Sequence, residues 1–304
     1  MQRNSQRITT IGLLLGLVLF SPGHTQTSVV TDAFDPERAM AHVRMLSDTI
    51  GIRAVATPNE VQAADYLAAQ FVALGLETQV QTFPFDDLTS QNVIAVKPGQ
   101  NVAAGSIYIG AHYDSVEAGP GANDNASGTA VLLEAARLLS DETFGPSLIF
   151  IAFGGEEIGL SGSAYFANHL SPLKRYLARG MINMDCAGWG TGQAIGSVDE
   201  SADPLVQKTV ENAAVLNIPL AVTEVTEGDH ASFSAIKIPA IMLYSYAPEN
   251  WECGPNYHQP TDTSNTVDPN QMARIAQILL ATVRDLADDP PVQTLKRLWL
   301  PLMQ

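Results

Sequence analysis

A short apolar run ends in polar groups between Ile107 and Gly128, where the chain reads IYIGAHYDSVEAGPGANDNASG. The run predicts a buried strand, and the glycine-rich loop after it is typical of α/β proteins that carry polar groups at strand carboxyl ends. Residues two apart on a strand share a face, so we expect His112 and Asp114 to point the same way. A carboxylate beside an imidazole suits a metal-ligating histidine. Taken alone, the pair favours a plainer interpretation, namely polar groups exposed at a strand end.

Strand-like and helix-like segments alternate along the rest of the chain. Period-2 or continuous apolar patterns predict strands at 77–85, 92–96, 107–110, 147–153, 179–184 and 238–243. Apolar spacing of the helical kind predicts helices at 35–49, 59–74, 128–139, 163–169, 203–216 and 271–286. The alternation predicts a single three-layer α/β domain over residues 27–289, with a central, largely parallel mixed sheet covered by helices. Residues 290–304 form a C-terminal tail to which we assign no structure.

The first 26 residues have the pattern of a secretory signal peptide. Arg3 and Arg7 precede the ten-residue apolar run IGLLLGLVLF at 11–20. This run is too short to span a bilayer, so we expect cleavage, a secreted or periplasmic protein and no stable membrane span. The net charge of −16 disfavours nucleic acid as a partner. We expect a monomer.

The chain has two cysteines, Cys186 and Cys253. An exported protein can join such a pair in a disulfide, because its environment is oxidising. The alternative is two buried and inert thiols. The residues alone leave both interpretations open.

Acidic and imidazole side chains recur just after the predicted strands, and one further histidine occurs later in the sequence. The set is His112, Asp124, Glu156, Glu157, Asp185 and His258. Oxygen and imidazole donors without thiolate suit zinc, manganese or cobalt in a hydrolytic site. The adjacent Glu156 and Glu157 project differently, so one can bind metal while the other acts as general base. Two solvated acids are a poorer interpretation, because glycines and an apolar strand place this pair beside the core.

Five segments, HYD, GPGANDNASG, GGEEIGLSGS, NMD and YHQPTDT, resemble the co-catalytic zinc aminopeptidases of metallopeptidase family twenty-eight, and they occur in the same order. The resemblance covers roughly residues 35–286 and implies the zinc-peptidase type of α/β fold. It implies five ligands for two zinc ions: His112 and Asp185 for one, Glu157 and His258 for the other, and Asp124 for both. It also implies three further roles: Glu156 as general base, Asp114 as the group that orients His112, and Tyr257 as a donor to the oxyanion. Manganese or cobalt are the expected substitutes for zinc.

The resemblance further implies removal of N-terminal residues from peptides that have a free N-terminus. Some relatives carry an arginine that meets a substrate carboxylate, but here the nearby residue is Glu227, which puts that contact in doubt. We expect His230 to be structural or to line the pocket. The alternatives are a single-zinc glutaminyl cyclase and a non-catalytic binding ectodomain. Both fit less well, because the full set of ligands and Glu156 is present.

Overall fold

The computed structural model describes residues 33–198, 204–247 and 253–289. The predicted signal peptide (1–26) and the tail (290–304) lie outside these residues, so both segments and the domain boundaries stay predictions. Among the described residues, no helix is long and apolar enough to cross a membrane.

An eight-stranded sheet forms the middle layer, with the strand order β1-β2-β4-β3-β5-β8-β6-β7. The strands are β1 Glu77–Phe85, β2 Leu88–Lys97, β3 Ser106–His112, β4 Ser147–Phe153, β5 Ala178–Met184, β6 Gly192–Ser197, β7 Leu220–Glu224 and β8 Ala240–Tyr246. The four central strands β4, β3, β5 and β8 run parallel to one another. Strands β1, β2 and β4 pair antiparallel, as do β8 and β6. The predicted mixed sheet with a parallel centre is therefore confirmed.

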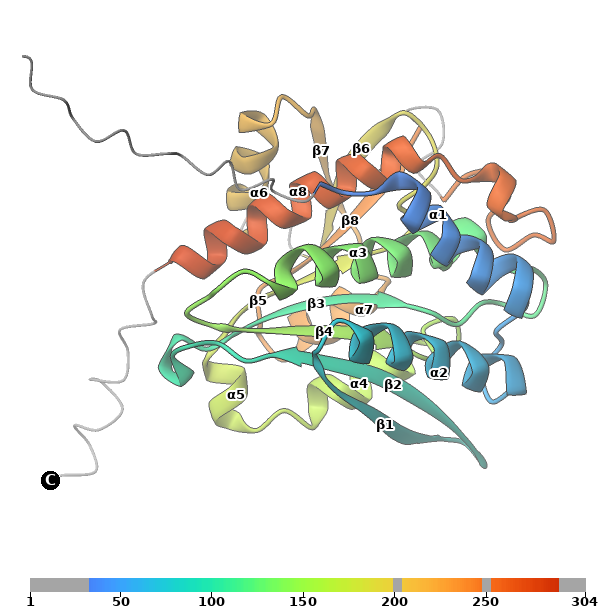
Figure 1. The fold of residues 1–304 in the computed structure, drawn as a ribbon, viewed down its shortest axis with the longest axis horizontal. Helices are drawn as coiled ribbons and strands as arrows, with labels where there is room; N and C mark the ends of the chain where they lie inside the picture. The colour runs from blue at the N-terminus through green and yellow to red at the C-terminus, as the bar shows by residue number, and fades with distance from the viewer. Residues whose placement is uncertain (1–32, 199–203, 248–252, 290–304) are drawn as a thin grey trace, which may run out of the picture. The chain divides into compact units, whose positions relative to one another are not determined.

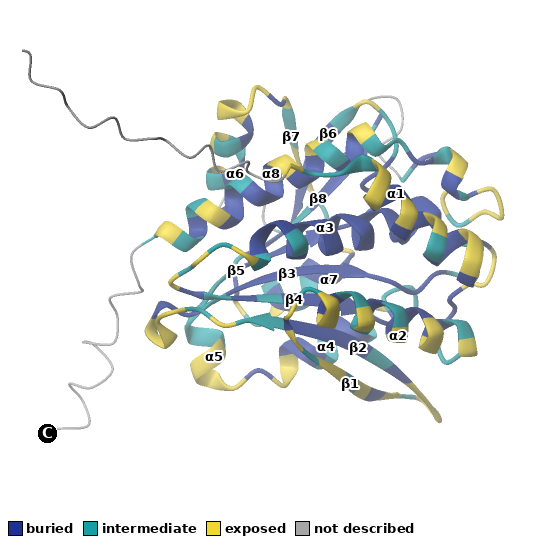
Figure 2. Cartoon of the chain, viewed as in Figure 1, coloured by how far each residue is buried: buried dark blue, intermediate teal, exposed yellow. Residues whose placement is uncertain are grey.

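Helices cover both faces of this sheet (Figure 1). They are α1 Pro36–Arg44, α2 Pro58–Ala73, α3 Gly128–Ser140, α4 Ser161–Asn168, α5 Pro172–Tyr176, α6 Pro204–Val215, α7 Asp229–Ala235 and α8 Pro269–Asp288. Helices α1, α2, α3, α6 and α8 share one apolar core with the sheet, and α4 and α7 pack into a second core on the other face. Helix α3 is buried along most of its length (Figure 2). The chain therefore has the predicted three layers.

Strand β3 lies between β4 and β5 in the middle of the sheet. Ile107 and Ile109 belong to the larger core, whereas Tyr108 points into the smaller one. There the Tyr108 ring packs 5.5 Å from the ring of Phe233. The alternation places His112 on the same face as Tyr108. Strand β4 pairs with β3 as far as His112 and β5 pairs with it as far as Gly110, so the backbone that leads to His112 is held on both sides.

Candidate active site

Three neighbouring parallel strands bring the predicted site residues to one edge of the sheet. His112 is the last residue of β3, and Asp185 directly follows β5. Glu156 and Glu157 follow β4 after two glycines. Since β3 lies between the other two strands, its histidine is flanked by acidic groups from both sides. Rigid strands therefore set the positions of these side chains.

Asp114 connects two of these strand ends. One of its oxygens lies 3.5 Å from His112 Nδ1, as expected for a group that orients the imidazole ring. The two oxygens also accept hydrogen bonds from the backbone N–H groups of Glu156 and Glu157, each at 3.2 Å. Asp114 therefore fixes the acidic pair as well as the histidine, a role that the sequence did not suggest.

Asp124 is placed by the loop after β3. The peptide bond between Asp124 and Asn125 is cis. The carboxylate of Asp262 accepts hydrogen bonds from the backbone N–H groups of Asn123, at 2.8 Å, and Asp124, at 3.1 Å. Asp262 follows His258 by four residues, so one turn connects the backbone of Asp124 with the segment that carries His258.

The two oxygens of Asp124 face two different imidazoles. Oδ1 lies 3.2 Å from Nε2 of His112, and that nitrogen is 3.5 Å from Oδ1 of Asp185. Oδ2 lies 3.2 Å from Nε2 of His258, and that nitrogen is 3.0 Å from Oε2 of Glu157. The five predicted ligands thus form two sets of donors that share Asp124.

Several polar atoms of this cluster are buried without a hydrogen-bond partner. They are Nδ1 and Nε2 of His112, Oε1 of Glu157, Oδ1 of Asp185 and Nε2 of His258. Buried polar atoms are normally paired, and buried carboxylates require a compensating charge. A divalent cation in each donor set meets both needs, and oxygen with imidazole is a donor set that zinc accepts. The residues therefore fit a pair of zinc ions.

The same burial shifts the protonation of the cluster. Burial raises the pKa of Asp124, but the imidazoles of His112 and His258, each 3.2 Å from one of its oxygens, outweigh burial and bring the pKa to about 2. Burial raises the pKa of Glu157 to about 8, and the charge of Asp124 adds to the effect. Asp124 is therefore the ionised centre of the site, whereas Glu157 holds a proton at neutral pH that a bound cation would displace.

Glu156 lies beside the two donor sets and lines the same pocket. Burial raises its pKa to about 10, against the charge of His112 and with the charge of Asp229. A carboxylate of Glu156 lies within 4.8 Å of donor atoms on His112 and Asp185. Its carboxyl group is therefore close enough to exchange a proton with a molecule held at the cluster, and cations bound there would lower this pKa so that the group can act as a base.

Tyr257 covers the side of the cluster that carries His258. The two rings stack with centroids 3.8 Å apart, and Tyr257 is 38% exposed. Burial and the charge of Asp124 raise the pKa of the phenol. The hydroxyl thus keeps its proton at neutral pH and can donate it in a hydrogen bond.

The pocket at the cluster has a volume of about 680 Å³. Its acidic end contains Asp124, Glu156, Glu157 and Asp185, together with His258. Its apolar wall contains Leu160, Val225, Met242 and Tyr244. Glu227 also lines it, in the region where the resemblance led us to look for an arginine. The pocket therefore combines acidic and imidazole groups with apolar lining residues.

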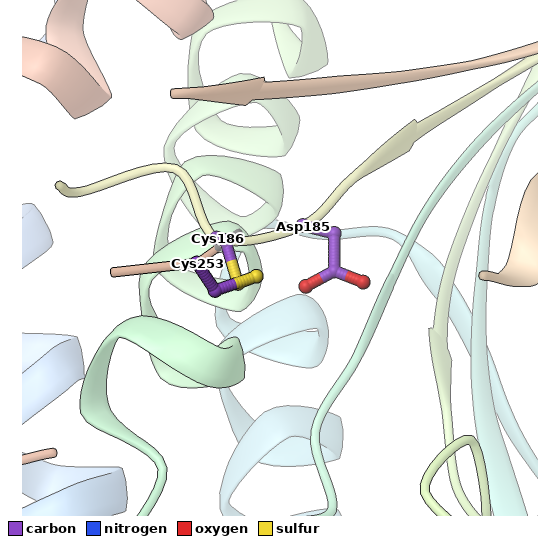
Figure 3. Close-up of side chains that lie close together, drawn as sticks. All are labelled: Asp185, Cys186 and Cys253. Atoms are coloured by element: carbon purple, nitrogen blue, oxygen red, sulfur yellow. A yellow bond between two sulfur atoms is a disulfide. The ribbon is translucent and has the colours of Figure 1, made fainter. Parts of the chain in front are cut away.

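Cys186 and Cys253 form a disulfide, which settles the alternative that the residues left open. Cys186 directly follows Asp185, and Figure 3 shows the bond beside that carboxylate. Asp185 and the two sulfur atoms are close enough together to suggest a metal site. The sulfurs are bonded to each other, however, so the bond is a structural link between β5 and the segment that carries Tyr257 and His258.

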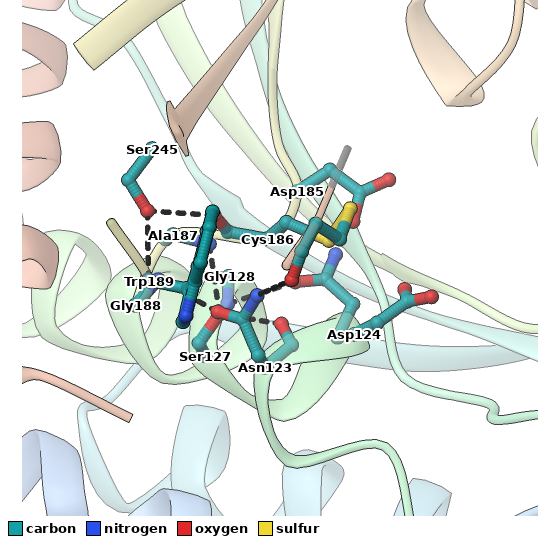
Figure 4. The surroundings of a disulfide bond; sticks show 12 residues. Asn123, Asp124, Ser127, Gly128, Asp185, Cys186, Ala187, Gly188, Trp189 and Ser245 are labelled. Atoms are coloured by element: carbon teal, nitrogen blue, oxygen red, sulfur yellow. Dashed lines mark hydrogen bonds between the residues drawn. A yellow bond between two sulfur atoms is a disulfide. The ribbon is translucent and has the colours of Figure 1, made fainter. Parts of the chain in front are cut away.

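Asn123 and Ser127 form a network around this disulfide (Figure 4). The Asn123 side chain donates to the carbonyl of Cys253 at 2.9 Å and accepts from the N–H of Gly188, also at 2.9 Å. Ser127 donates to the Asn123 carbonyl at 2.7 Å and accepts from the N–H of Ala187 at 2.8 Å. Sequence analysis missed these residues, and only their position beside Asp124 hinted at such a role.

Removing the disulfide is expected to destabilise the protein. The bond closes a separation of 67 residues, so a variant with Cys186→Ala and Cys253→Ala should lose about 2–4 kcal/mol of unfolding free energy. Denaturant unfolding measures this loss. Reductant should bring the wild-type protein to the stability of the variant and leave the variant unchanged. Equal stability of the oxidised protein and the variant would show that the bond contributes nothing.

His230 is predicted to make stability depend on pH. The residue is buried, and this burial lowers its pKa to about 4, although Nε2 bonds to the Val225 carbonyl at 2.9 Å. The folded pKa lies below the unfolded value of about 6.5, so unfolding takes up a proton between these values. Stability should fall as the pH drops from 6.5 to 4, by about 2–3 kcal/mol more than in His230→Gln. Unfolding curves across this range measure how the free energy of unfolding depends on pH. This dependence should be weaker than in the wild-type protein for His230→Gln and unchanged for the control His169→Gln, which alters an exposed histidine.

An eight-stranded mixed sheet, with oxygen and imidazole donors at the ends of its central strands, defines an α/β domain of the zinc-peptidase type. The sequence model of Peptidase family M28 matches residues 92–283. The chain belongs to this family. The resemblance that the sequence motifs suggested is thereby confirmed.

The most similar proteins include several aminopeptidases. The chain is 32% identical to Aminopeptidase YwaD of Bacillus subtilis (strain 168) over 213 residues, which cover 68% of this chain and 47% of YwaD. The chain spans about half the length of the first curated relatives that it matches. The structure of BSAP, a zinc aminopeptidase from Bacillus subtilis, superposes with a TM-score of 0.81 at 21% identity and covers 84% of this chain and 96% of BSAP. A glutaminyl cyclase from Porphyromonas gingivalis superposes with a TM-score of 0.73 at 24% identity, over 83% of this chain and 98% of the cyclase.

Proposed function

We propose that this protein is a secreted or periplasmic aminopeptidase that removes N-terminal residues from peptides with two zinc ions and Glu156 as general base. The observation that carries the proposal is the position of Asp124. Its two oxygens face two separate pairs, each made of an imidazole and a carboxylate. A shared carboxylate between two donor sets is the arrangement that a co-catalytic metal pair requires.

In this proposal each donor set would hold one ion. His112 and Asp185 would hold the first, Glu157 and His258 would hold the second, and Asp124 would be shared by both. Bound zinc supplies Lewis-acid polarisation of the peptide carbonyl and lowers the pKa of water. Manganese and cobalt accept similar donors, so we expect either metal to be able to substitute for zinc in the purified protein.

The protein's own residues then handle the proton and the developing charge. Glu156 takes a proton from the attacking water and delivers it to the leaving amine, because it is near the cluster without belonging to either donor set. Tyr257 remains protonated and donates a hydrogen bond to the oxyanion. Asp114 keeps the ring of His112 in one orientation.

The shape of the pocket favours a peptide with an apolar first residue. Leu160, Val225 and Met242 line the same pocket as the acidic residues and offer apolar contacts to such a side chain. The acidic end, with Glu227 on the same pocket, attracts the free α-ammonium group of a peptide. An N-acylated peptide lacks that charge and should therefore be a poor substrate.

Two observations support export of the mature protein. A basic and then apolar segment opens the chain, as in secretory signals. A disulfide links Cys186 and Cys253, and such bonds persist in oxidising compartments.

A glutaminyl cyclase is the second candidate, because a protein of that kind shares the fold. The presence of two donor sets favours the peptidase, since the cyclase alternative requires one zinc ion. Metal analysis of the purified, dialysed protein separates the candidates. About two zinc ions per chain is the expected result, whereas one ion would favour the cyclase and none a binding protein.

A further inference from the structure

Arg53 is completely buried near Asp114 and Asp124, with 0% of its surface exposed. Its guanidinium donates to five backbone carbonyls at 2.5–3.0 Å, those of Leu46, Gly51, Tyr113, Pro120 and Gly121. Nε and Nη2 each donate to one of these carbonyls, and Nη1 shares its two N–H groups among the other three. All five acceptors are backbone carbonyls, so the side chain holds backbone.

Three of these carbonyls belong to the segment between His112 and Asp124. Nε donates to Tyr113 at the beginning of this segment, and the two terminal nitrogens donate to Pro120 and Gly121 at its end. The backbone of Arg53 also bonds to Ser115 in both directions: its N–H donates to Ser115 Oγ at 2.9 Å, and its carbonyl accepts from the Ser115 N–H at 3.3 Å. Arg53 therefore holds both ends and part of the middle of the segment 113–121.

The charge of Arg53 also lies near acidic groups. Burial lowers the pKa of the guanidinium to about 10, and the charges of Asp114 and Asp262 oppose this shift. Arg53 is therefore a cation at neutral pH. Its positive charge interacts with the nearby carboxylates of Asp114 and Asp262, while its hydrogen bonds go to backbone carbonyls.

We propose that Arg53 is a positioning residue for the metal site, because it fixes the segment 113–121 and with it Asp114 and Asp124. The inference rests on the proposed function, in which Asp124 is shared by two ions. The fork of the guanidinium fixes the ends of the segment before metal binds, so less order has to be gained on binding.

Arg53→Lys separates this role from the charge alone. Lysine keeps the positive charge but offers a single ammonium with three donors, which cannot replace the five bonds of the fork. Arg179→Lys is the matched control. Arg179 also donates to backbone carbonyls, those of Ala104, Leu286 and Asp289, but it lies at the start of β5, at the other end of that strand from Asp185.

Two measurements on the full-length mature protein test the proposal. Hydrogen exchange of the metal-free protein reports the order of residues 113–124, and competition with a chelator reports zinc affinity. Arg53→Lys should raise exchange in this segment and weaken zinc binding by about 10–100-fold. Arg179→Lys should leave both quantities at the wild-type level, whatever its melting temperature.

The proposal would be overturned if Arg53→Lys had the same hydrogen exchange in 113–124 and the same zinc affinity as the wild-type protein. It would also be overturned if Arg179→Lys changed both quantities as much as Arg53→Lys does. If the wild-type protein binds no zinc, the proposed function fails, while exchange in 113–124 still decides the role of Arg53. If Arg53→Lys does not fold, Ser115→Ala removes the acceptor of the Arg53 N–H and should shift both quantities in the same direction to a smaller extent. No shift in that variant would then contradict the proposal.

Discussion

Glu156→Gln is expected to lower turnover of a peptide substrate by about 10²–10⁴-fold and to leave zinc binding intact. Glutamine has the shape of glutamate but cannot take the proton of the attacking water. Glu156 lies outside both donor sets that share Asp124, so its replacement removes no proposed ligand. Steady-state kinetics and metal analysis of the same preparation measure the two effects.

Glu227→Gln provides the control for this variant. Glu227 lines the same pocket, so the change removes one acidic group from it without touching the general base. Because Glu227 is proposed to attract the α-ammonium group, we expect this variant to raise KM and to keep kcat within a few-fold of the wild-type value. Near-wild-type turnover in Glu156→Gln would contradict the assignment of the base, and loss of zinc would show that Glu156 is a ligand instead.

Asp124→Ala is expected to have the largest effect on metal binding. The change removes the carboxylate whose two oxygens lie 3.2 Å from both imidazoles, so neither donor set stays complete. Because changes in groups that merely support ligands already cost about 10–100-fold in affinity, loss of the shared ligand should cost at least about 100-fold. Zinc titration with a competing chelator, followed by an activity assay, measures this loss.

Asp229→Asn is the matched control for Asp124→Ala. Asp229 is another buried carboxylate near the cluster, and burial raises its pKa to about 7. Asparagine keeps its shape, and Asp229 belongs to neither donor set. This variant should bind about two zinc ions per chain. If Asp124→Ala binds zinc as the control does, Asp124 is not the shared ligand.

The centre of the fold and the edge that carries the cluster were predictable because they depend on local patterns. An apolar run such as 147–153 has few structural interpretations, and period 2 along β3 places Tyr108 and His112 on one face. Glycine-rich loops after such strands indicated where the acidic side chains would lie. These signals need no knowledge of the remote parts of the chain.

Other elements were missed because their signals are weak. Strand β6, GQAIGS, contains two glycines and lacks the usual run of β-branched residues, and β7 is five residues long at the edge of the sheet. Helix α7 is only seven residues long, and the sequence patterns predict no helix there. Short elements gain their stability from packing, which a single sequence does not display.

The supporting contacts around the site were beyond the reach of sequence patterns. Arg53 precedes Tyr113 by 60 residues and Gly121 by 68, and no periodicity relates them. The pairing of Cys186 with Cys253 could be weighed but not decided, because distance in space was unknown. Long-range hydrogen bonds of this kind follow from the tertiary fold, whereas ligands at strand ends follow from the strands themselves.

Hydrolysis of leucyl-p-nitroanilide and of its N-acetylated form tests the central claim most directly. The purified mature protein is assayed on both compounds, with and without a zinc chelator. We predict cleavage of the free-amine compound alone, its loss on chelation and its recovery when zinc is restored. A protein that carries zinc and cleaves neither compound, or that cleaves the free-amine compound equally well after complete removal of metal, would contradict a zinc aminopeptidase.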